Sequence, residues 1–180
     1  GFVRDGHTTM VQVQGRILVQ GWKVEHFLNG KLAAACDFGS ADGKARVAKS
    51  KFSGMPQFMA SSRGHIALQN HGDEVAYRNI RVRPIGARTI ALFNGKDFGG
   101  WKWVAGEPAA LDQVWSVSPE GELVCKGQPA GYVRTEADYQ NYVLELDWRW
   151  NPVAGDNRNS GVLLRMIEKD GVWPKSLEAQ

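Results

Sequence analysis

The sequence predicts an all-β fold, either a β-sandwich or a barrel. Apolar and polar residues alternate along many short segments, whereas sustained helical periodicity is almost absent. Turn residues, mainly Gly, Asn and Pro, separate these segments at short intervals. Many short strands at such spacing are typical of sandwiches and barrels.

The first half of the chain contains six expected strands and a clear hairpin. Asn29-Gly30 separates two of the strands, and this dipeptide is the strongest short-range hairpin signal in a sequence. His71-Gly72-Asp73 marks a second turn. The expected strands span residues 10–13, 16–19, 23–28, 31–36, 65–69 and 74–82.

The second half adds six expected strands, at residues 89–93, 115–117, 122–125, 132–134, 142–150 and 161–167. Alternate residues of a strand face opposite sides of its sheet. In 142–150, one face therefore carries Leu144, Leu146, Trp148 and Trp150, and the other carries Glu145, Asp147 and Arg149. The first face is expected to lie in the core, and the charged face is either a site or a solvated surface.

Residues 38–64 differ from the rest of the chain. This stretch is rich in Gly, Ser and Lys, and its residues 42–51 favour one short helix. A long insertion in a tight β-fold is either functional or a surface excursion.

The composition excludes several classes of protein. At 180 residues, the chain is long enough for one hydrophobic core or two thin ones. Its 43% hydrophobic and 23% charged residues exclude a disordered tail, a collagen-like chain and a coiled coil. A net charge of +3 is too small to indicate nucleic-acid binding, and no apolar stretch is long enough for a membrane span.

The cysteines and tryptophans each have two interpretations. Cys36 and Cys125 fit no metal-ligand spacing and are either two buried thiols or one disulfide. The seven tryptophans either fill the core or line a face on which sugars stack.

Five segments together carry the motifs of one known family. They read EHFLNG at 25–30, GHIALQNHG at 64–72 with YRNI at 77–80, LFNGKD at 92–97 with Gly100-Trp101, NSGVLLR at 159–165, and WP at 173–174 with EAQ at 178–180. With these motifs the chain resembles the 3-keto-disaccharide hydrolase family over most of its length.

The resemblance implies a jelly-roll sandwich similar to concanavalin and laminarinase. Residues 1–86 resemble the C-terminal half of the family domain, and residues 87–180 resemble its N-terminal half. This order indicates either a slice through two tandem domains or a circular permutant. In both cases we expect the halves to pack as one sandwich, with segment 89–93 beside 74–82, because the family's first and last strands are neighbours.

The resemblance also implies a chemistry and a small carbohydrate as partner. Family members cleave glycosides that carry a ketone at C3. This carbonyl acidifies the C2 proton, so that a base forms an enolate, the enolate expels the C1 substituent, and water adds back. The site needs a base, an oxyanion stabiliser and an acid for the leaving oxygen. A divalent cation could serve as the stabiliser.

The matched motifs supply the site residues. The catalytic candidates are Glu178, His71 and Arg165, and the candidate sugar-binding residues are Asn159, Gln180 and His26. Arg165 could hold the C3 oxygen as negative charge develops, whereas His71 could act as base or metal ligand. We expect Arg165, Glu178 and Gln180 to converge on one concave face, with His71 at its rim.

Three of these residues also have simpler interpretations. His26 alternates with Val24 and Leu28, as a packed and hydrogen-bonded core histidine would. Arg165 ends an apolar run, which suits a plain salt bridge, and His71 suits a surface turn.

Two other functions are compatible with a concanavalin-like fold. A retaining glycosidase needs two carboxyl groups about 5 Å apart, whereas Glu145 and Asp147 are one strand repeat, about 6.8 Å, apart. Arg149 or Trp150 also stands where the acid would be, so this function is excluded. A non-catalytic carbohydrate-binding module is the remaining alternative. The resemblance further implies export from a bacterial cell, to the periplasm or outside, and nothing in the sequence indicates the oligomeric state.

Overall fold

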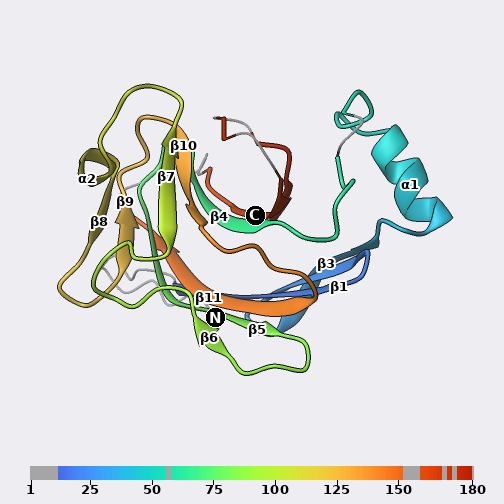
Figure 1. The fold of residues 1–180 in the computed structure, drawn as a ribbon, viewed down its shortest axis with the longest axis horizontal. Coiled ribbons are helices and arrows are strands. Elements are labelled where there is room, and N and C mark those ends of the chain that lie inside the picture. Colours follow the sequence, from blue (N-terminus) through green and yellow to red (C-terminus); the bar gives the residue numbers. More distant parts are fainter. Residues whose placement is uncertain (1–11, 56–57, 152–158, 168–169, 172–173, 180) are drawn as a thin grey trace, which may run out of the picture.

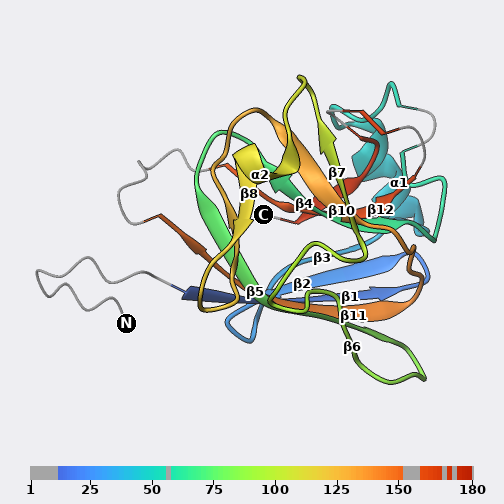
Figure 2. The same cartoon turned by 60° about the vertical axis from the view of Figure 1, so that its left-hand side comes forward.

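The computed structural model describes residues 12–55, 58–151, 159–167, 170–171 and 174–179. Two antiparallel sheets pack face to face, as Figures 1 and 2 show, and the predicted all-β sandwich is confirmed. The only helices in the described part of the chain are α1 (Ala41–Ala48) and α2 (Leu111–Val114). Neither is long and apolar enough to cross a membrane.

The larger sheet has eight strands. Seven follow one another in the order β3 (Lys31–Asp37), β2 (Lys23–Leu28), β1 (Gln12–Gln20), β11 (Tyr142–Trp150), β5 (Val75–Pro84), β9 (Leu123–Cys125) and β8 (Trp115–Val117). The short β6 (Ile90–Ala91) pairs with β5 beside this path. The expectation that segment 89–93 lies beside segment 74–82 is therefore confirmed.

The smaller sheet has five strands. Their order is β13 (Leu177–Ala179), β12 (Val162–Met166), β4 (His65–Asn70), β10 (Gly131–Thr135) and β7 (Trp101–Ala105). Strands from residues 1–86 and 87–180 are interleaved in both sheets: β11 lies between β1 and β5, and β4 lies between β12 and β10. The assignment of the halves to the two ends of the family domain stays a prediction.

The β2–β3 hairpin forms where Asn29-Gly30 predicts it. Asn29 and Gly30 have φ angles of 48° and 77°, the left-handed pair that a tight hairpin turn needs. By contrast, β1 is one strand instead of the two segments 10–13 and 16–19. Gly15 does not interrupt it, because its missing side chain makes room for a neighbour: a Cβ there would lie 2.4 Å from Cζ3 of Trp148.

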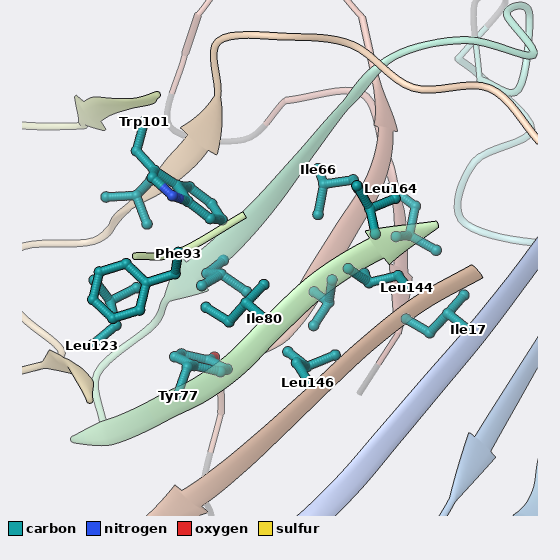
Figure 3. Packing of buried hydrophobic residues seen from close by; sticks show 14 of the residues in the cluster. Ile17, Ile66, Tyr77, Ile80, Phe93, Trp101, Leu123, Leu144, Leu146 and Leu164 are labelled. Carbon is teal, nitrogen blue, oxygen red and sulfur yellow. The ribbon is translucent and has the colours of Figure 1, made fainter. Parts of the chain in front are cut away.

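The core lies between the sheets, as the close view in Figure 3 shows. Leu144 and Leu146 of β11 are almost fully buried, and Trp148 packs against the same cluster. The opposite face of β11 carries charges, with Asp147 accepting a hydrogen bond from Asn79 Nδ2 at 2.7 Å. The predicted alternation along residues 142–150 is confirmed.

Cys36 and Cys125 are free thiols, so the alternative of a disulfide between them is wrong. Cys125 is buried in the core, and this burial raises the pKa of its thiol to about 12. A thiol in such surroundings stays protonated and unreactive.

Candidate functional site

The outer face of the smaller sheet brings side chains from all five strands together. The strand register places one row across it, from β7 to β13: Lys102, Arg134, Ala67, Leu163 and Glu178. A second row runs beside the first and contains Val104, Tyr132 and Gln69, followed by Gly161, whose carbonyl oxygen accepts from Gln69 N. Both rows point away from the larger sheet, because the alternate residues of these strands lie in the core between the sheets.

A pocket of about 530 Å³ opens at the β13 end of this face. Gln69, Leu163 and Glu178 come from the sheet itself. The walls come from two loop segments, one with Lys51, Phe52, Met55 and Phe58, and one with Pro174, Lys175 and Ser176. Both segments lie on the outer side of the smaller sheet in Figures 1 and 2.

The Glu178 side chain lies across Gly161. A Cβ on Gly161 would approach Oε1 of Glu178 to 2.6 Å and its Cγ to 2.9 Å. The glycine of the NSG motif therefore makes room for this side chain. Glu178 is exposed, and its side chain reaches from the first row over Gly161 into the second row, which contains the almost buried Gln69.

Three phenylalanines form a packed wall beside the pocket. The rings of Phe52 and Phe58 stack with centroids 4.3 Å apart, and Phe58 meets Phe38 edge to face at 6.5 Å. The ammonium group of Lys51 lies 5.2 Å from the centroid of the Phe52 ring. Such a wall suits the apolar faces of a sugar or of its aglycone.

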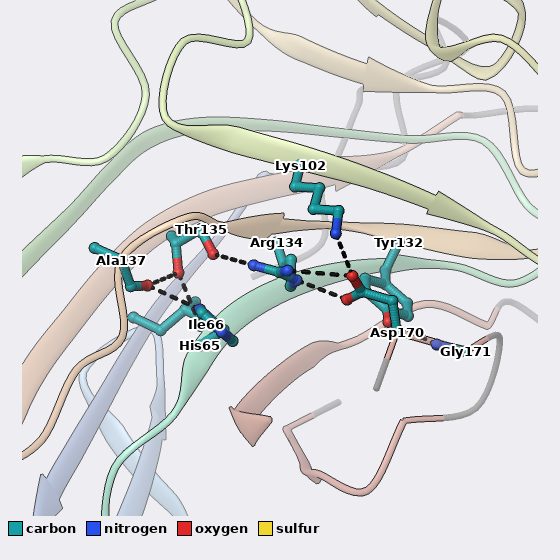
Figure 4. A network of polar contacts seen from close by, with 9 residues as sticks. All are labelled: His65, Ile66, Lys102, Tyr132, Arg134, Thr135, Ala137, Asp170 and Gly171. Atoms are coloured by element: carbon teal, nitrogen blue, oxygen red, sulfur yellow. Dashed lines mark hydrogen bonds and ion pairs between the residues drawn. The ribbon is translucent and has the colours of Figure 1, made fainter. Parts of the chain in front are cut away.

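An ion-pair network, shown in Figure 4, lies at the other end of the face. Asp170 accepts from Arg134 Nε at 2.8 Å and from Lys102 Nζ at 2.5 Å, and Gly171 N donates to the Tyr132 hydroxyl at 3.4 Å. The hydrogen bond from Arg134 lowers the pKa of Asp170 to about 2, with Lys102 adding to the effect. These contacts tie the segment after β12 to β10 and β7.

Arg165 does not join this face, so its expected convergence with Glu178 is wrong. A β-bulge between Leu163 and Met166 shifts the β12–β4 register, and Arg165 adopts a φ of 53°. Regular alternation would have placed Arg165 on the same side as Leu163. The bulge turns it inward, where it donates to Gly21 O and lies over the Trp22 ring.

The inward position gives Arg165 a structural role. Its side chain bridges from β12 to the β1–β2 turn of the opposite sheet. Burial lowers the pKa of the guanidinium, and its Nε and Nη1 atoms have no hydrogen-bond partner among the residues that the structure describes. The simpler interpretation, a salt bridge, is also wrong, because no carboxylate among the described residues pairs with Arg165.

His71 and Asn159 lie together at the end of β4. Asn159 Nδ2 donates to Nδ1 of His71 at 2.5 Å, and Asn159 N donates to Asp73 Oδ2 at 2.8 Å. Because Nδ1 is the acceptor, Nε2 carries the proton of the neutral imidazole. His71 follows Gln69 by two residues, about 7 Å along a strand, and neither His71 nor Asn159 is among the described residues that line the pocket.

Of the remaining two predicted residues, the structure describes only His26, which does not line the Glu178 pocket. His26 lies between the sheets, 8% exposed, and burial lowers the pKa of its imidazole. Gln180 lies outside the described residues. Within the described part of the chain, no three His, Cys, Asp or Glu residues are placed to hold a metal ion.

Comparison with known families matches residues 13–83 and 88–180 to the 3-keto-alpha-glucoside-1,2-lyase-like domain. The two matched segments include most of the chain. The chain belongs to this family. No curated protein matches the chain.

The lyase-like domain also contains pocket residues that the sequence interpretation missed. Gln69 stands in the matched motif at 64–72, where it was available as a candidate. Lys51, Phe52 and Phe58 lie in the Gly-, Ser- and Lys-rich stretch 38–64, whose composition indicated an insertion but no particular residue. Only the fold brings this insertion beside Glu178.

Proposed function

We propose that this 3-keto-glucoside lyase-like domain cleaves 3-keto-glycosides in the pocket at Glu178. The observation that carries the proposal is the position of the Glu178 carboxylate. It is exposed on the outer face, beside Gln69 and Phe52, in a pocket whose volume of about 530 Å³ suits a disaccharide-sized ligand. Family membership supports the substrate class.

The proposed reaction begins with proton transfer to Glu178. A ketone at C3 acidifies the C2–H bond, and the carboxylate takes this proton. The electron pair passes into an enolate, whose oxygen bears the negative charge. The enolate then re-forms the ketone as the C1–oxygen bond breaks, and the leaving oxygen takes a proton. Addition of water across the C1–C2 double bond completes hydrolysis.

Gln69 and the two lysines of the pocket take the place that the sequence suggested for Arg165. The Gln69 amide is almost buried, which limits its motion, and its N–H groups could donate to the C3 oxygen. Lys51 and Lys175 supply positive charge at the walls of the same pocket. Each of these groups favours the enolate over the neutral ketone, because negative charge develops on the oxygen.

His71 is the proposed acid for the leaving oxygen. Its hydrogen bond from Asn159 keeps the proton on Nε2, the nitrogen that would donate to the leaving oxygen of a ligand on the outer side of the sheet. A ligand that extends from Glu178 past Gln69 reaches the His71 end of β4. Asn159 orients the imidazole in this arrangement.

The test uses a 3-keto-glucoside and the corresponding glucoside with a hydroxyl group at C3. Each is incubated with the protein in deuterated water. The proposal expects cleavage of the first alone, with deuterium at C2 of the product. Glu178→Gln and His71→Ala should each lower turnover by about 10²–10⁴-fold, whereas the exposed Glu107→Gln control should not. Cleavage of the 3-keto substrate without deuterium at C2 would refute the mechanism.

The phenylalanine wall favours a second candidate, a carbohydrate-binding module without catalysis. Stacked aromatic rings also serve sugar binding, and Gln69 and Ser176 supply neutral polar groups in the same pocket. In that case the chain binds the 3-keto-glucoside, as measured by calorimetry, and cleaves neither substrate.

A further inference from the structure

A second cavity, of about 330 Å³, lies between the two sheets. It is on the inner side of the smaller sheet, whereas the Glu178 pocket is on the outer side. Aromatic and aliphatic side chains dominate its lining, with Leu146, Trp148 and Trp150 contributed by β11. The polar side chains are those of His26, Tyr77 and Ser160.

The size and lining of this cavity resemble those of a small-molecule site. A volume of about 330 Å³ lies in the range of pockets that hold small ligands. No Asp, Glu, Lys or Arg is among the described residues that line it. The described lining therefore favours a neutral ligand, since none of its side chains offsets a buried charge.

His26 is the one histidine in the lining of this cavity that the structure describes. It is 8% exposed, and it makes no hydrogen bond within the part of the chain that the structure describes. A neutral imidazole has one N–H donor and one acceptor nitrogen. The ring nitrogens are not among the fully enclosed polar atoms without a partner, so they remain accessible to water or to a ligand in the cavity. Burial also keeps this imidazole neutral at pH 7, because it lowers the pKa.

The two hydroxyl groups of the cavity are already engaged. Ser160 Oγ donates its single proton to Gln69 O at 2.5 Å. In the 2.6 Å hydrogen bond between the two hydroxyl groups, Tyr77 must therefore be the donor and Ser160 Oγ the acceptor. Neither hydroxyl has a proton left for a ligand. His26 is therefore the one side chain of the described lining that can still donate and also accept.

We propose that this inter-sheet cavity binds a neutral, mainly apolar molecule with a planar ring and one hydroxyl group, such as a phenol. The ring packs against Trp148, Trp150 and Leu146, and the hydroxyl pairs with His26. The site is separate from the proposed catalytic pocket and does not depend on that activity.

Calorimetric titration of the 180-residue chain with phenol and with toluene tests the proposal. The two probes have nearly the same shape, and only phenol has a hydroxyl group. The native chain should bind both, with a rise in melting temperature. His26→Leu should lower the ratio of phenol affinity to toluene affinity by about 2- to 12-fold. This factor corresponds to the loss of one net hydrogen bond. An unchanged ratio of the two affinities would overturn the role of His26.

A second variant tests the location of the site. Leu28 lines the cavity and is half-buried, so Leu28→Trp should fill the space and abolish binding of both probes. The exposed Ile90→Ala serves as control and should leave both affinities unchanged. Absence of binding to the native chain, or native-like binding to the Leu28→Trp variant, would refute the proposal.

Discussion

Replacement of Gly161 by alanine tests whether Glu178 acts from its observed position. The added Cβ would lie 2.6 Å from Oε1, whereas an ordinary contact begins at 3.4 Å. Oε1 must therefore move by about 0.8 Å, the difference between these two distances. Because Glu178 is exposed, its side chain can swing toward solvent, and no unusual φ at Gly161 opposes a side chain.

The expected result is a loss of activity with little loss of stability. A displacement of about 1 Å at a reacting group lowers the rate by about 10²-fold. Turnover of a 3-keto-glucoside by Gly161→Ala should therefore fall by about 10²-fold, and deuterium incorporation at C2 should fall with it. The melting temperature should stay within about 4 °C of the native value, since a strain below about 1 kcal/mol is expected.

Gly54→Ala is the matched control, because a Cβ at Gly54 meets nothing within 4 Å. This variant should keep both turnover and melting temperature. Native turnover in Gly161→Ala would refute the reasoning, since Glu178 would then act from another position. A large fall in melting temperature would show instead that Gly161 is needed for folding.

Two predictions concern stability. A Cβ at Gly64 would lie 2.5 Å from the backbone carbonyl carbon of Arg165. Gly64→Ala should therefore lower the free energy of unfolding, measured in urea, by about 1–3 kcal/mol. An unchanged urea midpoint would contradict this close approach. Arg134 holds the pKa of Asp170 at about 2, below its unfolded value of 3.8, so this ion pair stabilises the fold above pH 4 and is lost as the pH falls toward 2. Because solvent screens this ion pair, it contributes about 1 kcal/mol to the free energy of unfolding. Urea titrations at several pH values should show that the loss of stability on acidification is smaller by this amount in Asp170→Asn.

Local patterns in the sequence predicted most of the strands. The β2–β3 hairpin depends on Asn29-Gly30, whose backbone preferences are intrinsic to the two residues. The alternation in 142–150 predicted which face of β11 lies in the core, because the period of two belongs to any strand. Residues 101–105, which form β7, were missed, and the two short segments expected near residue 15 are one strand.

Two positions show where local patterns were insufficient. Gly15 resembles a strand break in the sequence, but it stands in a continuous strand because Trp148 packs over it. Arg165 resembles an outward partner of Glu178, but the bulge in β12 turns it inward. Both outcomes depend on residues that are distant in the sequence.

By itself, the sequence determined the all-β class, the hairpin, the charged and apolar faces of β11, and the family motifs. Tertiary structure alone decided which motif residues share a face. It placed Glu178 with Gln69 on the outer face, brought His71 to Asn159, and left His26 and Arg165 between the sheets. The physical reason is that the side on which a strand residue points depends on register and bulges, and these are set by pairing with strands far away in the chain.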